Sequence, residues 1–420
     1  MSQPDRPTTS PDLDERDLRT RIRLLVVLFL SAALNRTGFI AVFTVTALAA
    51  EDILGSARWS GLAAAFGTLG LAVGTTPMAA MMARRGRRPG LVVGLSVAVV
   101  GAAVSAYGVR SASFLLLLGG LFLFGFGNSA DRMSRYAAAD IAPVAIRSSA
   151  IAAVVWAGTV GSVLGPVLLP LGSRLVEPFG FSEYAGGYLI GGVLAASAMV
   201  LVLVALRPDP LQLAGVIKSP DEGRGAPLRP LLRSPIVRYA VASLVIGQAA
   251  MVLLMSMTPV HIRRAGEGLA LVGLVIGVHT FGMFFFSPVS GYLADRFGKI
   301  RLIVIGQVLL IVAALMASLA AGDDRALLLP ALFLLGLGWN FGFVAGSSLI
   351  TDAAEGATRI RLQGFSDTIM WMSGAVASVL SGIILEWIQF SGLALVGAAL
   401  VAYPLYLRYR LGVSESPSSL

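Results

Sequence analysis

A few charged side chains interrupt long apolar stretches of the sequence, where a charge needs a reason to be present. Arg36 lies well inside a stretch that begins at Leu24, and Asp131 and Arg132 lie near the end of another. A charge at the centre of a bilayer costs at least about 2.5 kcal/mol on insertion scales, so such a residue should face a cavity or a partner. A guanidinium group can bind a carboxylate at two points, and a buried aspartate can exchange a proton. These three residues are candidates for a substrate and proton pathway, with purely structural ion pairing as the alternative.

Uncharged residues in the same kind of stretch are weaker candidates for this pathway. Asn128 and Asn340 can contact a substrate or simply hydrogen-bond between helices, and Trp339 can form an aromatic wall or merely pack. Gln248 can contribute to an adaptable cavity surface or to packing. His279 can titrate near neutral pH, although a hydrogen-bonded structural histidine is favoured.

Motifs for enzymatic catalysis, metal binding and phosphate binding are missing from the sequence. There is no cysteine, and the two histidines, His261 and His279, do not have a metal-ligand spacing. Gly298-Lys299 has no glycine at the spacing of a phosphate-binding loop. We therefore predict no catalytic residue, no metal site, no cofactor and no enzymatic activity.

The composition is that of a membrane protein. Of the 420 residues, 56% are hydrophobic and 13% are charged, and the mean hydropathy is +0.82, whereas soluble domains have about 25% charged residues. Stretches of about 20 apolar residues can cross a hydrocarbon core of about 30 Å. The sequence predicts an all-α membrane protein with twelve transmembrane helices, at 24–50, 59–82, 90–109, 113–137, 148–171, 184–206, 236–259, 268–291, 301–321, 327–349, 362–386 and 388–407.

The chain repeats itself with a constant offset of 212 residues. The offset superposes Thr68 on Thr280, Asn128 on Asn340, Asp140 on Asp352 and Arg147 on Arg359. Parallel repeats in a membrane protein indicate a pseudo-twofold transporter with its substrate site between the halves. The predicted parts are an N-terminal tail at 1–22, six-helix bundles at 23–206 and 236–409, a linker at 207–235 and a C-terminal tail at 410–420.

Basic residues are distributed unevenly between the two sides of the predicted bundle. An even number of spans places both termini on one side, which also carries the basic clusters at 84–88 and 207–235. The opposite loops have few basic residues, mostly beside acids. The positive-inside rule therefore predicts a cell-membrane protein with both termini in the cytoplasm. The net charge of +9 then reflects topology and lipid headgroups, and no nucleic-acid partner is expected.

The segment 291–301 resembles the signature G-x-L-[AS]-D-R-x-G-R-[KR] of the major facilitator superfamily, found between the second and third helices of each half. The matching residues are Gly291, Leu293, Ala294, Asp295, Arg296, Gly298 and, as a basic residue, Lys299. The resemblance covers essentially the whole chain and implies that family's fold of two pseudo-symmetric six-helix bundles. Glycines allow a tight turn and close helix approach, and Asp295 facing a helix N-terminus would form a latch between the halves. A basic loop that only sets topology is the alternative.

An upstream copy of this segment begins at Ala79 and adds Arg84 and Gly86 to the candidate latch. It has Ala83 where the acid belongs, which leaves a latch in the first half incomplete.

A second segment, Gly161-Ser-Val-Leu-Gly165-Pro166, resembles the G-x-x-x-G-P motif of antiporters in the same superfamily. Small residues four apart give a flat face for helix packing, and proline adds a kink. Packing alone is the alternative. The antiporters' arginine in the fourth span should fall near Leu121 and is missing, so it cannot be carried over.

The resemblance implies a secondary transporter that works by alternating access, with spans 1, 4, 7 and 10 around the cavity. Arg36 and Asp131 are then expected to pair, whereas Arg135 and Asp367 are placed near the membrane interface. We favour export of a small amphipathic or anionic organic compound in exchange for protons by a monomer in the bilayer. The alternatives are proton-coupled uptake of an organic anion bound by Arg36, and a membrane scaffold or sensor without transport.

Overall fold

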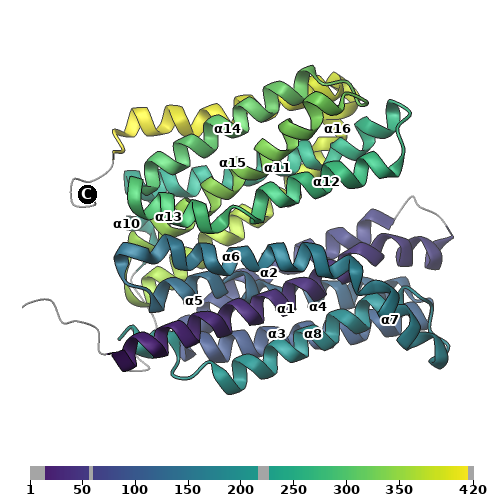
Figure 1. Cartoon of the computed structure of the whole chain (residues 1–420), viewed down its shortest axis with the longest axis horizontal. Helices are drawn as coiled ribbons and strands as arrows, with labels where there is room; N and C mark the ends of the chain where they lie inside the picture. Colours follow the sequence, from purple (N-terminus) through teal and green to yellow (C-terminus); the bar gives the residue numbers. More distant parts are fainter. Residues whose placement is uncertain (1–14, 56–59, 216–226, 415–420) are drawn as a thin grey trace, which may run out of the picture.

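The computed structural model describes residues 15–55, 60–215 and 227–414, and these residues fold almost entirely into helices (Figure 1). Eleven helical segments among them are long and apolar enough to cross a membrane. The elements are α1 (Glu15–Leu54), α2 (Ser60–Arg85), α3 (Arg87–Arg110), α4 (Phe114–Arg132), α5 (Ser134–Ile141), η2 (Val144–Ile146), α6 (Arg147–Val167), α7 (Leu169–Val176), η3 (Glu177–Phe179), α8 (Ala185–Ala205), α9 (Pro210–Leu213), α10 (Leu228–Leu231), α11 (Pro235–Arg264), α12 (Leu269–Phe284), α13 (Ser287–Phe297), α14 (Lys299–Leu319), α15 (Arg325–Asp352) and α16 (Gly356–Leu411).

The last helix, α16, contains the eleventh and twelfth predicted spans in one continuous assignment. Its backbone leaves the helical region at Gln389, where φ is +61°. Three contacts with α11 trace its path: Gly374 lies beside Gln248, Phe390 stacks on His261, and Gly397 lies beside Leu254. The contact point on α11 moves towards the end of that helix and then returns. The chain therefore reverses near Gln389, and α16 crosses twice, in agreement with the twelve predicted spans.

The helices form two bundles that lie one above the other in Figure 1, with α1–α8 in the lower bundle and α11–α16 in the upper one. Close helix crossings recur in the two bundles with the 212-residue offset. A Cβ at Gly94 of α3 would lie 2.8 Å from a carbonyl oxygen of α4, and one at Gly306 of α14 would lie 2.7 Å from a carbonyl oxygen of α15. Only glycine permits helix backbones to approach so closely. The repeat in the sequence is thus a repeat in packing.

One end of the molecule, called the termini face below, is where α1 begins and α16 ends, at the left of Figure 1. Asp140 accepts hydrogen bonds from Arg87 of its own half and Arg359 of the other half, and Asp352 pairs in the same way with Lys299 and Arg147. The 212-residue offset converts each set of residues into the other. Two pseudo-symmetric charge clusters therefore hold the halves together at this face.

Two close helix approaches also join the halves at the termini face, and they too are related by the offset. A Cβ at Gly291 would lie 2.6 Å from the Ala152 side chain and 2.8 Å from the Ser148 carbonyl oxygen. A Cβ at Gly364 would lie 2.3 Å from the Ala79 side chain, and the next atoms of the facing helix are at least 3.7 Å away. In each of the two pairs, Gly291–Ala152 and Gly364–Ala79, one residue must therefore be glycine for the termini face to close.

The Gly364 contact predicts a compensating pair of substitutions. Gly364→Ala should favour opening of the termini face, because its methyl group overlaps that of Ala79 alone. Ala79→Gly should restore closure in the double variant. Labelling of Ser348→Cys with a membrane-impermeant maleimide reports the opening, since Ser348 is buried where it meets Ser148 of the other half. Equal labelling of the single and double variants would contradict the prediction.

Candidate substrate site

A cavity of about 240 Å³ lies between the two bundles and is lined by residues of both. Three arginines face it from the first half: Arg36 on α1, Arg132 on α4 and Arg135 on α5. Aromatic side chains form much of the remaining wall, namely Phe39, Phe284, Trp339, Phe343 and Trp371. A cavity that joins cationic groups to aromatic faces suits a ligand with the same two features.

Arg36 is held by protein groups on two neighbouring helices. Its Nε lies 3.4 Å from Asp131 Oδ2, and its Nη1 donates to the carbonyl oxygens of Val154 (2.8 Å) and Val155 (3.2 Å). The expected ion pair between Arg36 and Asp131 is thus present. Both residues are buried, with exposed fractions of 6% and 1%. The charge of Arg36 is already balanced before any ligand binds.

The Gly161-x-x-x-Gly165-Pro166 segment on α6 packs directly against α1 at the level of Arg36. A Cβ at Gly161 would lie 2.9 Å from the Arg36 carbonyl carbon, and one at Gly165 would lie 2.7 Å from Ile40. Pro166 stands inside the last turn of α6. The small residues therefore bring the α6 carbonyl groups close enough to α1 to receive the Arg36 side chain.

Arg132 is the arginine of the cavity whose charge is not balanced. Its side chain forms no ion pair or hydrogen bond with the described residues, and its Nε is buried without an acceptor. The guanidinium lies over the rings of Phe39 (4.7 Å) and Trp371 (5.4 Å). Trp371 Nε1 is likewise a buried donor with no acceptor among these residues. Both residues line the cavity, and each has a buried donor without an acceptor among the described residues.

Arg135 and Asp367, which were expected near the membrane interface, form a buried ion pair between the two halves. Arg135 Nη2 donates to Asp367 Oδ1 at 2.7 Å, and its Nε donates to Ser347 Oγ at 3.2 Å. The Arg135 guanidinium also covers the Phe343 ring at 4.4 Å. Both charged side chains are almost completely buried, because the opposite half covers them. No property of one helix alone reveals that cover.

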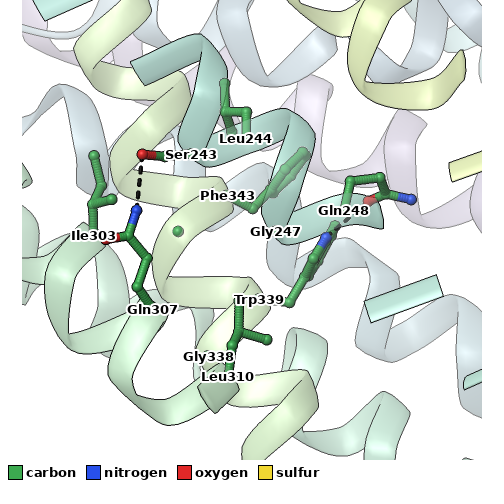
Figure 2. Close-up of a pocket in the computed structure, with 11 residues that line it drawn as sticks. Ser243, Leu244, Gly247, Gln248, Ile303, Gln307, Leu310, Gly338, Trp339 and Phe343 are labelled. Atoms are coloured by element: carbon green, nitrogen blue, oxygen red, sulfur yellow. Dashed lines mark hydrogen bonds between the residues drawn. The ribbon is translucent and has the colours of Figure 1, made fainter. Parts of the chain in front are cut away.

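Trp339 and Gln248, for which the sequence left a cavity surface or packing open, both line the cavity and contact each other. Trp339 Nε1 donates to Gln248 Oε1 at 2.8 Å, and the indole stacks on Phe343 with 4.5 Å between ring centroids. Behind them lies a narrow space of about 10 Å³ beside Ser243 and Gln307, where Gln307 Nε2 donates to Ser243 Oγ (Figure 2). The hydrogen bond to Gln248 fixes the face that the indole presents.

Asn128, Asn340 and His279 lie outside the cavity and hydrogen-bond between helices. Asn128 accepts from Asn35 at 2.7 Å, and Asn340 donates to the Met283 carbonyl and to Ser287 while accepting from Ser290. His279 Nδ1 lies 3.0 Å from the Leu332 carbonyl oxygen. The described contacts of these three residues are those of the structural alternative, and a role in the pathway stays a prediction.

Asp295 reaches across to the other half at the termini face. Its carboxylate accepts from the backbone N–H groups of Ser148 (3.0 Å) and Ser149 (2.8 Å), and from Ser149 Oγ (2.6 Å). These groups form the N-terminus of α6, where an acid is stabilised by the helix dipole. Asp295 is therefore positioned as the predicted latch requires.

The other candidate latch residues have more local contacts. Gly298 and Gly86 begin the helices that follow them with φ of +99° and +102°, values that favour glycine. Arg296 donates to Tyr292 of its own helix, and Arg84 is exposed on α2. Of the candidate latch residues, Asp295 hydrogen-bonds to the other half, and Gly291 allows the close approach.

Sequence reasoning assigned no role to the charge clusters of the termini face. Asp140 and Asp352, and Arg147 and Arg359, had been matched only as members of the repeat. The available signal was that the repeat preserves charges near helix ends, where the halves must meet. Nothing in the sequence around Phe39 and Trp371 distinguishes a residue of a cavity wall from one that only packs.

Two pseudo-symmetric bundles around a cavity at their interface define a class of secondary membrane transporters. The profile of the Major Facilitator Superfamily matches residues 28–278 and 266–418. The chain therefore belongs to the Major Facilitator Superfamily, and it is a multi-pass membrane transporter rather than an enzyme.

Relatives of similar length share about a third of the sequence. The uncharacterized MFS-type transporter YdeG of Bacillus subtilis is 34% identical over 383 residues, which cover 90% of this chain and 89% of the relative. The riboflavin transporter RfnT of Brucella anthropi is 32% identical over 393 residues, which cover 92% and 96%. The structure of the human organic anion transporter MFSD10 matches with a TM-score of 0.73 at 17% identity, covering 92% of this chain and 99% of that one, and this likeness shows the fold alone.

The Asp295 contact predicts a change in transport rate more than in substrate binding. Asp295→Asn removes the charge that faces the α6 N-terminus, so it should shift the equilibrium between conformations and slow turnover several-fold. Binding of substrate to purified protein should change less than twofold. Arg296→Gln is the matched control, because the hydrogen bond and ring contacts of Arg296 lie within its own helix. Unchanged turnover in folded Asp295→Asn would leave this segment as a topology signal.

The Arg36 contacts predict that transport depends on the shape of the guanidinium group as well as on its charge. Arg36→Lys keeps the charge but loses the donors that reach Asp131 and the two carbonyl groups, so we expect normal insertion and loss of most transport. Arg36→Gln should be at least as impaired. Transport in reconstituted vesicles measures both. Full transport by an Arg36→Gln, Asp131→Asn double variant would show that the pair is structural.

Proposed function

We propose that the chain transports a small aromatic organic anion by alternating access, coupled to protons. The observation that carries this proposal is Arg132, an arginine that lines the cavity and whose side chain forms no ion pair or hydrogen bond with the described residues. A carboxylate or sulfonate has two or more acceptor oxygens and can bind a guanidinium group at two points.

Charge complementarity supports an anion. Arg36 is paired with Asp131 and Arg135 with Asp367, which leaves Arg132 as the arginine of the cavity without a carboxylate partner. An unpaired charge in a region of low dielectric is costly, and an anionic ligand would remove that cost.

The wall of the cavity supports an aromatic body on that anion. Phe39, Trp371 and the stacked pair Trp339–Phe343 surround about 240 Å³, and planar rings pack well between such faces. The space suits a ligand of one or two rings.

The same charges support proton coupling. A proton that neutralises a carboxylate near the cavity raises the positive charge there and so strengthens binding of an anion. Anion and proton would then bind the same state and move together, which favours uptake. With the termini face in the cytoplasm, as the arginine distribution predicts, the structure is the state closed to the cytoplasm.

Proton-coupled efflux is the second candidate function. It is favoured by the antiporter-like segment at Gly161, Gly165 and Pro166, which packs on α1 beside Arg36. Riboflavin is a further candidate substrate, because the transporter RfnT of that name is 32% identical over 92% of this chain.

Transport by proteoliposomes with an imposed pH gradient separates these candidates. The panel is benzoate, 2-naphthoate, 2-naphthalenesulfonate, riboflavin and, as a control without a ring, acetate. Weak acids enter an alkaline interior without a carrier, so uptake is counted above that of protein-free liposomes. On that measure we expect the naphthyl anions to accumulate when the outside is acidic, and acetate to show no uptake. Accumulation of the anions when the interior is acidic would favour exchange of the anion for protons. Transport of riboflavin without transport of the anions would contradict the anion proposal.

The site predicts that Arg132 sets affinity for the anion. Arg132→Gln should weaken 2-naphthalenesulfonate binding by about 10- to 100-fold, since a charged hydrogen bond contributes about 1.5–3 kcal/mol. Trp371→Phe keeps the ring and removes the N–H donor, so it should weaken binding by a smaller factor. The control is Arg84→Gln, because Arg84 is exposed and does not line the cavity. Isothermal titration of the purified protein measures all three, and equal affinities would refute the assignment.

A further inference from the structure

A second charged site lies at the boundary between the halves, next to the cavity and separate from the termini-face clusters. It consists of Arg135 and Tyr136 on α5 and Asp367 on α16. Their side chains are buried, whereas the rim pair Arg147–Asp352 has side-chain exposed fractions of 18% and 25%. Arg135 lines the cavity as well. The same residue thus joins the two halves and borders the space for a ligand.

Only one of the two carboxylate oxygens of Asp367 accepts hydrogen bonds. Oδ1 accepts from Arg135 Nη2 at 2.7 Å and from Tyr136 OH at 2.9 Å. Oδ2 is buried and has no partner among the described residues. An unpartnered carboxylate oxygen in such a place is costly, and a bound proton would reduce that cost.

The other charged groups around Asp367 already have partners. Arg87 on α3 acts on Asp367 through space but pairs with Asp140, and its Nη2 donates to Gln363, one turn before Asp367 on α16. On α4, Asp131 is held by Arg36. Arg135 is therefore the cation in direct contact with Asp367. A change in the charge of Asp367 acts first on its ion pair with Arg135.

We propose that Asp367 is the proton-binding residue of this transporter, and that Asp367 and the substrate anion compete for Arg135. The anion half of the proposal rests on the proposed function, whereas the proton half does not. A proton on Oδ2 makes Asp367 neutral and weakens its hold on Arg135. The guanidinium is then available to an anion in the cavity, beside Arg132.

The same pair links the proton to the conformation. Arg135 belongs to the first half and Asp367 to the second, so their ion pair favours closure of the termini face. Protonation weakens one of the contacts that holds the face shut, and opening exposes the carboxylate to water on that side. By reciprocity, a condition that favours protonation also favours opening.

Distance measurements between the halves test the proton site without any substrate. The natural chain has no cysteine, so Arg85→Cys and Phe297→Cys supply two exposed labelling positions on opposite halves. Spin-label distances should lengthen when the pH falls from 7.5 to 5.5. Asp367→Asn should give the longer distances at both pH values, and Asp367→Glu should keep the response.

Asp352→Asn is the matched control for this measurement, because it breaks a pair between the halves at the exposed rim. It should favour opening at both pH values and still respond to acid. A response of Asp367→Asn equal to that of the unmodified chain would overturn the proposal.

Binding of 2-naphthalenesulfonate tests the competition, because this probe stays ionised over the whole range. Its affinity should rise about tenfold from pH 7.5 to 5.5, within the usual range of coupling between two sites. In Asp367→Asn the affinity should be high and independent of pH, and Arg135→Gln should remove the dependence by weakening binding at both values. A pH dependence that persists in Asp367→Asn would overturn the competition. Absent binding with an intact pH response of the distances would refute the anion proposal and keep the proton site.

Discussion

A buried charge must have a partner, and in this protein many of the partners lie on the opposite half of the chain. Asp140 and Asp352 each receive one cation from their own half and one from the other, and Asp367 receives Arg135 across the same boundary. In a region of low dielectric, separation of such groups is costly unless water or another ion replaces the partner. The boundary between the halves is therefore held by interactions that are strong when the halves meet and replaceable when water enters. A transporter needs contacts of this kind, because both conformations must be accessible.

The small residues and the charges of the termini face work together. Gly291 and Gly364 let helices of opposite halves approach within van der Waals distance of a backbone or a methyl group. This approach brings Asp295 to the N-terminus of α6, and it brings Arg359 to Asp140. Larger side chains at the two glycines would keep the charges too far apart for hydrogen bonds. Close packing thus sets the range over which the electrostatic contacts act.

The pseudo-symmetry of the fold is broken at the cavity. Arg36 corresponds to Gln248 and Arg135 to Ser347 under the 212-residue offset, so the guanidinium groups come from one half. The second half supplies most of the aromatic wall and the acceptor Asp367. Symmetric helices give the two halves equal roles in closure, whereas the unequal side chains give the cavity one cationic side and one aromatic side. A ligand with a charged end and a flat ring matches that asymmetry.

The sequence by itself determined the membrane class, the twelve spans and the two-fold repeat, because these depend on hydropathy and on identities at a constant spacing. It also identified Arg36 and Asp131, since a charge within an apolar stretch is visible without any neighbour. The tertiary structure decided which polar residues face the cavity. Asn128 and Asn340 met the same sequence criteria as Arg36 and Asp131, yet each lies between helices of its own bundle. Arg135 and Asp367 lie near helix ends and are buried by the opposite half. The periodicity of one helix describes its own faces, and only the packing of the two bundles determines which of those faces are covered and by what.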